Sequence, residues 1–206
     1  MKIGFHNSIE EISKNEWNSL LNDINYPFLK HDFLQLLENT NCVGAKTGWI
    51  PLHITVSKDN SLLAAMPLYL KSHSQGEFVF DHSWANAFYQ HGLDYYPKLV
   101  SSIPHTPASG PRFLIKEGEN KKELFEMIKE GVKSIAAKNN ISSWHILFPM
   151  EEEVDFYDDS NLSIRKNAQF IWFNKNFESF EDYISSFRAR PVSYTHLRAH
   201  ETPRYL

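Results

Sequence analysis

The segment from His53 to Leu70 reads HITVSKDNSLLAAMPLYL, and it indicates two strands joined by a tight turn. The runs HITVS and LLAAMPLYL are apolar and rich in strand-forming residues, and the KDNS between them is typical of a hairpin turn. Pro67 interrupts the second run. Because proline cannot donate to a strand ladder, that strand is expected to lie at an edge or to be bulged there.

Two helical patterns precede this hairpin. The first opens at Ser8, which we expect to cap the helix with Glu11 as its capping-box partner, and its apolar stripe extends to Leu21. The second is short, follows Pro27 and runs through His31–Glu38.

A longer helix and further strands follow the hairpin. The helix begins at Asn120 with Glu123 as its partner, and its apolar face consists of Leu124, Phe125, Ile128, Val132 and Ile135. The runs SWHILF from Ser143 and AQFIWF from Ala168 predict strands, and Ser179 is expected to cap a final helix. This mixed order predicts an α/β or α+β domain with a mixed, largely antiparallel sheet flanked by helices.

Composition excludes several classes of protein. The 206 residues carry 21 basic and 25 acidic side chains, a net charge of −4, and the basic residues are scattered, so DNA binding is not expected. The sole cysteine, Cys42, cannot form an intramolecular disulfide, and the N-terminal sequence has no apolar signal core, so a cytoplasmic location is expected. No apolar run reaches membrane-spanning length, so no transmembrane segment is expected and any membrane role would be peripheral.

The segment from Met66 to Arg112 differs from ordinary core sequence. It interleaves charged, aromatic and histidine side chains without a regular helical or strand period. Since charged side chains are rarely buried unless paired, this interleaving suggests a concave wall that carries oriented polar groups. The alternative is an aromatic-rich surface over a core with hydrogen-bonded histidines.

This segment also carries a family resemblance. The run LYLKSHSQGEFVFDHSWANAFYQHGLDYYPKL from Leu68, together with TGW from Thr47, TPASGPR from Thr106 and SSFRAR from Ser185, resembles the FemAB-like family of predicted bacterial N-acyltransferases. The resemblance implies a relation to the peptidoglycan aminoacyl transferases and an acetyltransferase-like (GNAT) fold, typically with two such domains in one chain. On this basis residues 1–177 form an N-terminal GNAT-like domain, and residues 178–190 begin a linker helix towards a missing second domain.

Two positions depart from the family pattern. His105 lies between Pro104 and Thr106, where such sequences usually read proline-phenylalanine-threonine-proline. Ile171 precedes Trp172, where a histidine is common. We expect these changes to alter the pocket without removing the central motif.

The last residues of the chain are expected to be foreign to the natural protein. The run VSYTHLRAHET from Val192 is the in-frame translation of a common transposase-type sequencing adapter. Residues 191–206 are therefore expected to be a non-native tail, and the natural protein is expected to continue beyond this fragment.

Transfer of an acyl group to an amine sets the roles that these residues are expected to fill. The amine must be neutral to attack, and a negatively charged carrier must be held in place. The candidates for taking the proton are Asp81 and His105, and the candidate substrate-binding residues are Lys71, Ser74, Glu77, Trp84, Tyr95, Tyr96, Lys98, Thr106 and Arg112. Alternatively, Glu77 or Asp81 forms an ion pair inside the domain with Lys71 or Arg112. The histidines follow no recognised metal-ligand spacing, so no metal is expected.

The sequence does not decide the identity of the acyl donor. The glycines are isolated, so the phosphate-binding glycine-rich loop typical of acetyl-CoA enzymes is absent from the sequence, and no cofactor is expected in this fragment. Acyl-CoA and aminoacyl-tRNA both remain as donors, although the chain lacks a broad basic surface for tRNA. We therefore expect a fragment, inactive alone, of an N-acyl or aminoacyl transferase for an amine of a cell-wall precursor or another small acceptor.

Two alternatives come from other classes. One is a non-catalytic domain that recognises sugar or peptide of peptidoglycan. The other is a hydrolase, which is disfavoured because no G-x-S-x-G motif is present.

Overall fold

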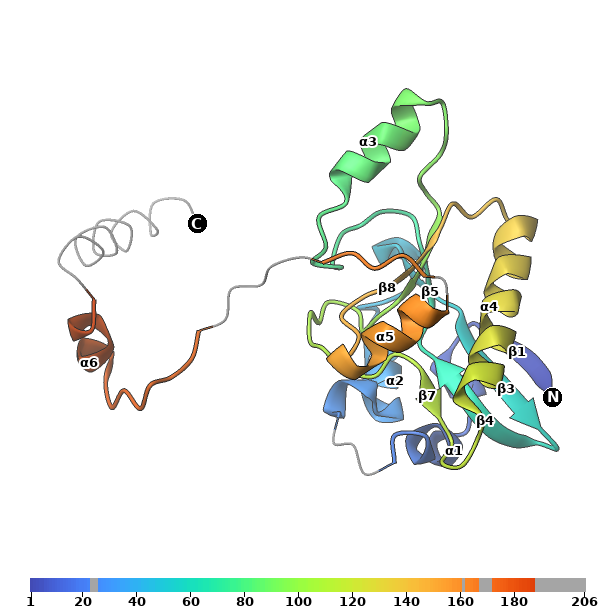
Figure 1. The fold of residues 1–206 in the computed structure, drawn as a ribbon, viewed down its shortest axis with the longest axis horizontal. Coiled ribbons are helices and arrows are strands. Elements are labelled where there is room, and N and C mark those ends of the chain that lie inside the picture. The colour runs from blue at the N-terminus through green and yellow to red at the C-terminus, as the bar shows by residue number, and fades with distance from the viewer. Residues whose placement is uncertain (23–25, 161, 167–171, 188–206) are drawn as a thin grey trace. The chain divides into compact units, whose positions relative to one another are not determined.

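The computed structural model describes residues 1–22, 26–160, 162–166 and 172–187. The chain divides into two compact units, Met1–Ile164 and Arg165–Leu206. The first unit contains two four-stranded sheets with helices around them (Figure 1). The tail predicted at residues 191–206 lies outside the described residues, as does most of the strand predicted from Ala168.

The first sheet has the strand order β1-β3-β4-β7, and all neighbouring strands are antiparallel. Its strands are β1 (Lys2–His6), β3 (His53–Lys58), β4 (Ser61–Met66) and β7 (Leu114–Ile115). Between β3 and β4, Asp59 and Asn60 have φ values of 50° and 61°, the positive φ that a type I′ hairpin turn needs at both positions. The predicted hairpin is therefore confirmed.

The second sheet has the order β2-β5-β6-β8. Its strands are β2 (Trp49–Pro51), β5 (Tyr69–Lys71), β6 (Lys98–Ser101) and β8 (Trp144–Ile146). Pairing is antiparallel except between β6 and β8, which are parallel. Pro67 lies where the chain leaves β4 in the first sheet and enters β5 in the second, so its missing N–H falls outside both ladders.

Short helices cover one face of the first sheet. They are η1 (Ile9–Glu11), α1 (Lys14–Ser19), η2 (Pro27–Leu29) and α2 (His31–Asn39), and η3 (Ala45–Thr47) leads into β2. Their core residues Trp17, Leu20, Leu29 and Leu34 belong to the same cluster as Ala65 of β4. The second predicted helix is confirmed by α2.

The single long helix predicted from Ser8 is wrong. Ser8 caps only the three-residue turn η1, where its side chain accepts from the Glu10 N–H. Ile12 then adopts an extended conformation, which ends the turn, and Ser13 caps a separate helix by accepting from the Glu16 N–H.

Two further helices complete the main core. In α4 (Lys121–Lys138), the Asn120 side chain accepts from the Glu123 N–H, which confirms the predicted start. Leu124, Phe125 and Ile128 of α4 cluster with residues of β3 and β4, and Tyr157 of α5 (Glu151–Asp159) joins them.

The excursion between β5 and β6 contains α3 (His82–Gln90), which buries none of its residues. It stands away from the two sheets in Figure 1, where its C-terminal end points outwards. The sequence did not predict this helix, because a helix without a buried face leaves no apolar period.

In the second unit, α6 (Phe180–Ser185) begins after Ser179, whose side chain accepts from the Asp182 N–H, so the predicted cap is confirmed. Around α6, aromatic rings such as Phe177 and Tyr183 pack 5.3 Å apart between centroids. Across the described part of the chain, no helix has the length and apolarity that a membrane crossing requires.

Candidate functional site

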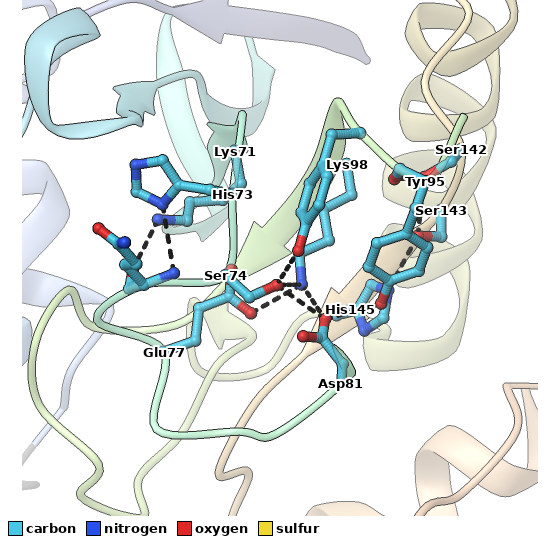
Figure 2. Close-up of polar contacts among 12 residues, drawn as sticks. Lys71, His73, Ser74, Glu77, Asp81, Tyr95, Lys98, Ser142, Ser143 and His145 are labelled. Carbon is cyan, nitrogen blue, oxygen red and sulfur yellow. Dashed lines mark hydrogen bonds and ion pairs between the residues drawn. The ribbon is translucent and has the colours of Figure 1, made fainter. Parts of the chain in front are cut away.

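A buried group of charged residues connects the α3 excursion to the second sheet. We call it the lysine–carboxylate cluster, and it consists of Lys71, Ser74, Glu77, Asp81, Tyr95, Tyr96 and Lys98. Lys98 Nζ lies at its centre and donates to Ser74 Oγ at 2.8 Å, Glu77 Oε2 at 2.8 Å and Asp81 Oδ2 at 2.5 Å (Figure 2). Three acceptors around one ammonium group use all three of its protons, so the Lys98 charge is fully engaged.

Asp81 is held as a carboxylate. Its Oδ2 also accepts from Tyr95 OH at 2.7 Å and Ser74 Oγ at 2.9 Å. Burial alone would raise the pKa of Asp81, but the hydrogen bonds from Lys98, Tyr95 and Ser74 outweigh burial and keep that pKa below its usual value. A carboxylate with a lowered pKa is a weak base, so this environment suits Asp81 to hold a positive charge.

The two carboxylates each have one oxygen that is not satisfied. Glu77 Oε1 and Asp81 Oδ1 are buried and accept no hydrogen bond from the described residues. Burial raises the pKa of Glu77, and the neighbouring Lys98 and Lys71 only partly oppose this. Buried oxygens without a hydrogen-bond donor are rare in proteins.

Lys71 differs from Lys98 in its surroundings. Its Nζ donates to the Gln75 carbonyl at 3.0 Å and lies 3.7 Å above the centre of the Trp49 ring. Burial lowers the pKa of Lys71 to about 8, Glu77 opposes this shift, and the charge of Lys98 adds to it. Lys71 is therefore an amine that can exchange a proton near neutral pH.

The segment after β5 packs closely on Trp49. Trp49 Nε1 donates to the Gln75 carbonyl at 3.1 Å. A Cβ on Gly76 would lie 2.6 Å from His105 Nδ1, and one on Gly48 would lie 2.3 Å from His73 Nε2. Both glycines have positive φ, so their lack of a side chain is what lets this segment approach Trp49.

Four predicted site residues lie outside the cluster. The His105 ring lies 5.6 Å from that of Trp49, and its Nε2 donates to the Cys42 carbonyl. Thr106 donates to its neighbour, the Pro104 carbonyl. Trp84 lies on α3 and is half exposed.

Arg112 has its own set of partners. It is fully buried, and its guanidinium donates to the carbonyls of Leu147 at 2.8 Å and Ala108 at 2.6 Å. The ion pairs of Glu77 and Asp81 are therefore formed by Lys98, in place of the Lys71 or Arg112 that the sequence suggested.

Sequence reasoning missed two contributors to the site. One is Trp49, whose ring covers Lys71. The other is the backbone carbonyl of Gln75, which accepts hydrogen bonds from Trp49 Nε1 and from Lys71 Nζ. Trp49 carried a usable signal because it belongs to the TGW motif, whereas a backbone carbonyl leaves none.

Within the described residues, no group of three His, Cys, Asp or Glu side chains is arranged to hold a metal ion. The start of α4 carries no net charge, because Lys116, Lys121 and Lys122 balance Glu117, Glu119 and Glu123, so local charge neither favours nor disfavours phosphate there.

Solved structures define the class of this fold. A ribosomal-protein-alanine N-acetyltransferase from Brucella melitensis biovar Abortus 2308 has 12% identity and a TM-score of 0.50, over 84% of this chain and 98% of that one. An aminoglycoside 6'-N-acetyltransferase from Acinetobacter haemolyticus has 12% identity and a TM-score of 0.48, over 86% and 100%. The fold is that of the GNAT acetyltransferases, which confirms the predicted fold class; at this identity the likeness concerns the fold alone.

A family model identifies the family of this chain. The chain belongs to the FemAB-like family, described as peptidoglycan biosynthesis/recognition, which matches residues 8–193. Among curated proteins, no sequence matches this chain.

Proposed function

We propose that this chain is part of an N-acyl or aminoacyl transferase whose acceptor is an amine of a cell-wall precursor or another small molecule. The family, which is associated with peptidoglycan, and the acetyltransferase fold both support this proposal. The observation that carries it is Lys71, an amine with a pKa near 8, beside two buried carboxylates that each have an unused oxygen.

These groups match the needs of an acceptor amine. At neutral pH the acceptor arrives as an ammonium ion, and Glu77 Oε1 and Asp81 Oδ1 accept its hydrogen bonds. Lys71 in its neutral form takes one proton and leaves the acceptor able to attack. A carbon–nitrogen bond then forms at the acyl carbonyl, the carrier leaves with the electron pair of the broken bond, and the remaining extra proton of the nitrogen passes to the leaving carrier.

The cluster is buried, so access is part of the proposal. Ser74, Glu77 and Asp81 all lie in the segment between β5 and α3. We infer that this segment shifts to admit the acceptor. In this scheme Asp81 orients the acceptor, and His105 at the edge of Trp49 is the second candidate for proton transfer.

The donor is acyl-CoA or aminoacyl-tRNA. We propose that the donor binds a second GNAT-like domain supplied by the intact gene, that the protein acts in the cytoplasm, and that this chain alone is inactive.

The test is an acyl-transfer assay with a muropeptide that has one free amine. The protein from an intact gene is expected to form the amide with one of the two donors, acetyl-CoA or aminoacyl-tRNA, and the muropeptide with that amine acetylated is the control. Amide formation by the present chain alone would contradict the two-domain part of the proposal. No product with either donor from the intact protein would contradict the proposal as a whole.

Non-catalytic recognition is the second candidate. The family is associated with recognition of peptidoglycan as well as with its biosynthesis, which favours this candidate. The burial of Lys98 and Asp81 also favours it, because the cluster is closed to solvent. A recognition domain would bind the muropeptide in calorimetry without any donor, and binding without transfer by the intact protein would select this function.

A further inference from the structure

The α3 excursion exposes an unusual amount of apolar surface. Five large apolar side chains are at least half exposed, namely Phe78 (56%), Phe80 (78%), Trp84 (50%), Tyr89 (70%) and Leu93 (57%). They fall within a single stretch of the chain. Exposed aromatic side chains gathered in this way mark a surface that binds something.

The helix α3, which carries Trp84 and Tyr89, has a well-defined end and fixed contacts. At its C-terminal end Gly92 has a φ of 70°, and the Leu93 N–H donates to the Phe88 carbonyl at 2.9 Å, which is the helix-ending arrangement that glycine favours. The Phe88 ring packs 5.2 Å from that of Tyr95, and at the start of the helix Asp81 is held by Lys98. The apolar residues are therefore presented on an ordered projection.

The projection is also uncharged. From His82 to Leu93 the sequence HSWANAFYQHGL contains no Asp, Glu, Lys or Arg, in a chain that has 25 acidic and 21 basic residues. Asp81, just before it, is buried and paired with Lys98. Asp94, directly after this stretch, is exposed, so the uncharged surface is limited to α3 and the residues up to Leu93.

We propose that α3 and its flanking residues bind the interfacial region of a lipid bilayer. Tryptophan and tyrosine prefer the headgroup level of membranes, because their rings are apolar while their N–H and O–H groups stay hydrated. A projection that points away from the body of the unit can reach a flat surface (Figure 1). A sugar or peptide, by contrast, is usually held in a concave site with several polar groups.

The experiment measures sedimentation of the full chain with vesicles. One set of vesicles consists of phosphatidylcholine alone and the other of phosphatidylcholine with phosphatidylglycerol. The wild type is expected to sediment with both, since aromatic burial does not need anionic lipid. The variant Tyr89→Ser/Leu93→Ser is expected to partition at least about tenfold more weakly, because two apolar side chains no longer enter the interface.

Leu36→Ser is the matched control. Leu36 on α2 is 57% exposed, as is Leu93, so both changes remove the same side chain at the same exposure. The control is expected to sediment like the wild type, and melting curves verify that all three proteins fold.

Four results would overturn the proposal. They are no sedimentation of the wild type with either vesicle, binding only when phosphatidylglycerol is present, equal weakening by the control, and unchanged binding of the Tyr89→Ser/Leu93→Ser variant. Self-association that this variant abolishes, without vesicle binding, would assign the surface to a second copy of the chain. None of these results depends on acyl transfer.

Discussion

Lys71 and Lys98 are direct cross-strand neighbours in the antiparallel β5–β6 pair, and both side chains are fully buried. Two like charges opposite each other in a sheet repel, and burial strengthens the repulsion. The two lysines have different sets of partners, which reduces the repulsion between them. Lys98 has two carboxylates and a hydroxyl, whereas Lys71 has one carbonyl and an aromatic ring.

The first prediction concerns Lys98. Lys98→Met keeps most of the side-chain volume but leaves two buried carboxylates, Glu77 and Asp81, without a cation. Removal of one partner from a buried ion pair destabilises proteins by about 3–5 kcal/mol, and we expect a loss of that size in the free energy of unfolding measured with urea. The control is Lys133→Met, which removes an exposed ion pair with Glu130 on α4 and should change stability little. Equal stability of the two variants would show that the cluster is not a stabilising ion pair.

The second prediction is a pH dependence that comes from Lys71. Its pKa is about 8 in the folded protein and about 10.4 in the unfolded chain. Between these values the unfolded chain binds more protons than the folded protein. The free energy of unfolding of the wild type therefore rises by roughly 1 kcal/mol per pH unit from this group as pH rises. Below about pH 8 the full cost of burying the charged Lys71 lowers the stability.

Lys71→Met removes that group. The variant should exceed the wild type in stability at pH 7, and the difference should shrink as pH rises from about 8 towards 10.4. Urea unfolding of both proteins over this range is the measurement, and taking the difference removes the other titrating groups. A stability difference that is independent of pH would show that Lys71 keeps its ordinary pKa.

The third prediction separates two roles of Asp81. Asp81→Asn should lower the free energy of unfolding by about 1–3 kcal/mol, because Lys98 keeps Glu77 but loses one charged partner. With saturating acceptor, turnover per folded molecule should then be largely retained in the intact enzyme, while the KM for the acceptor rises because its ammonium group loses one carboxylate partner. A loss of roughly a hundredfold in turnover with unchanged melting would instead identify Asp81 as the proton acceptor.

The fourth prediction uses two glycines with positive φ. A Cβ at Gly76 would contact His105 and Trp49 within 3.0 Å, whereas nothing lies within 4 Å of one at Gly92. Gly92→Ala should therefore cost about 1 kcal/mol from backbone strain alone, and Gly76→Ala at least about 2 kcal/mol. The double variant Gly76→Ala/His105→Ala, measured by thermal unfolding, should be more stable than the sum of the two single effects predicts.

Elements of the fold could be predicted from the sequence where a few neighbouring residues determine the local backbone. The turn at Asp59 and Asn60 and the Asn120 cap of α4 each depend on a few neighbouring residues, and both were confirmed. Strand β1 and helix α5 were missed. A five-residue strand at the chain start has little pattern to detect, and EEEVDFYDD reads as a solvated charged stretch.

The candidate site was predictable in composition but not in pairing. The sequence singled out the segment from Met66 to Arg112 for its charged residues among aromatic ones, and in this segment Glu77 and Asp81 both pair with Lys98. Which cation pairs with which carboxylate depends on the β5–β6 register and on the path of the segment before α3, and neither is encoded locally. Arg112 illustrates the limit, because its carbonyl partners belong to the backbone and have no sequence signature.

The way the chain passes between the two sheets has a mechanical consequence. Only Leu52 separates β2 from β3, and only Pro67 and Leu68 separate β4 from β5. The Leu52 N–H donates to the Leu68 carbonyl at 2.8 Å, which ties these two crossings together. Rotation of one sheet against the other would have to break this hydrogen bond and bend both short connections, so we expect the two sheets to move together.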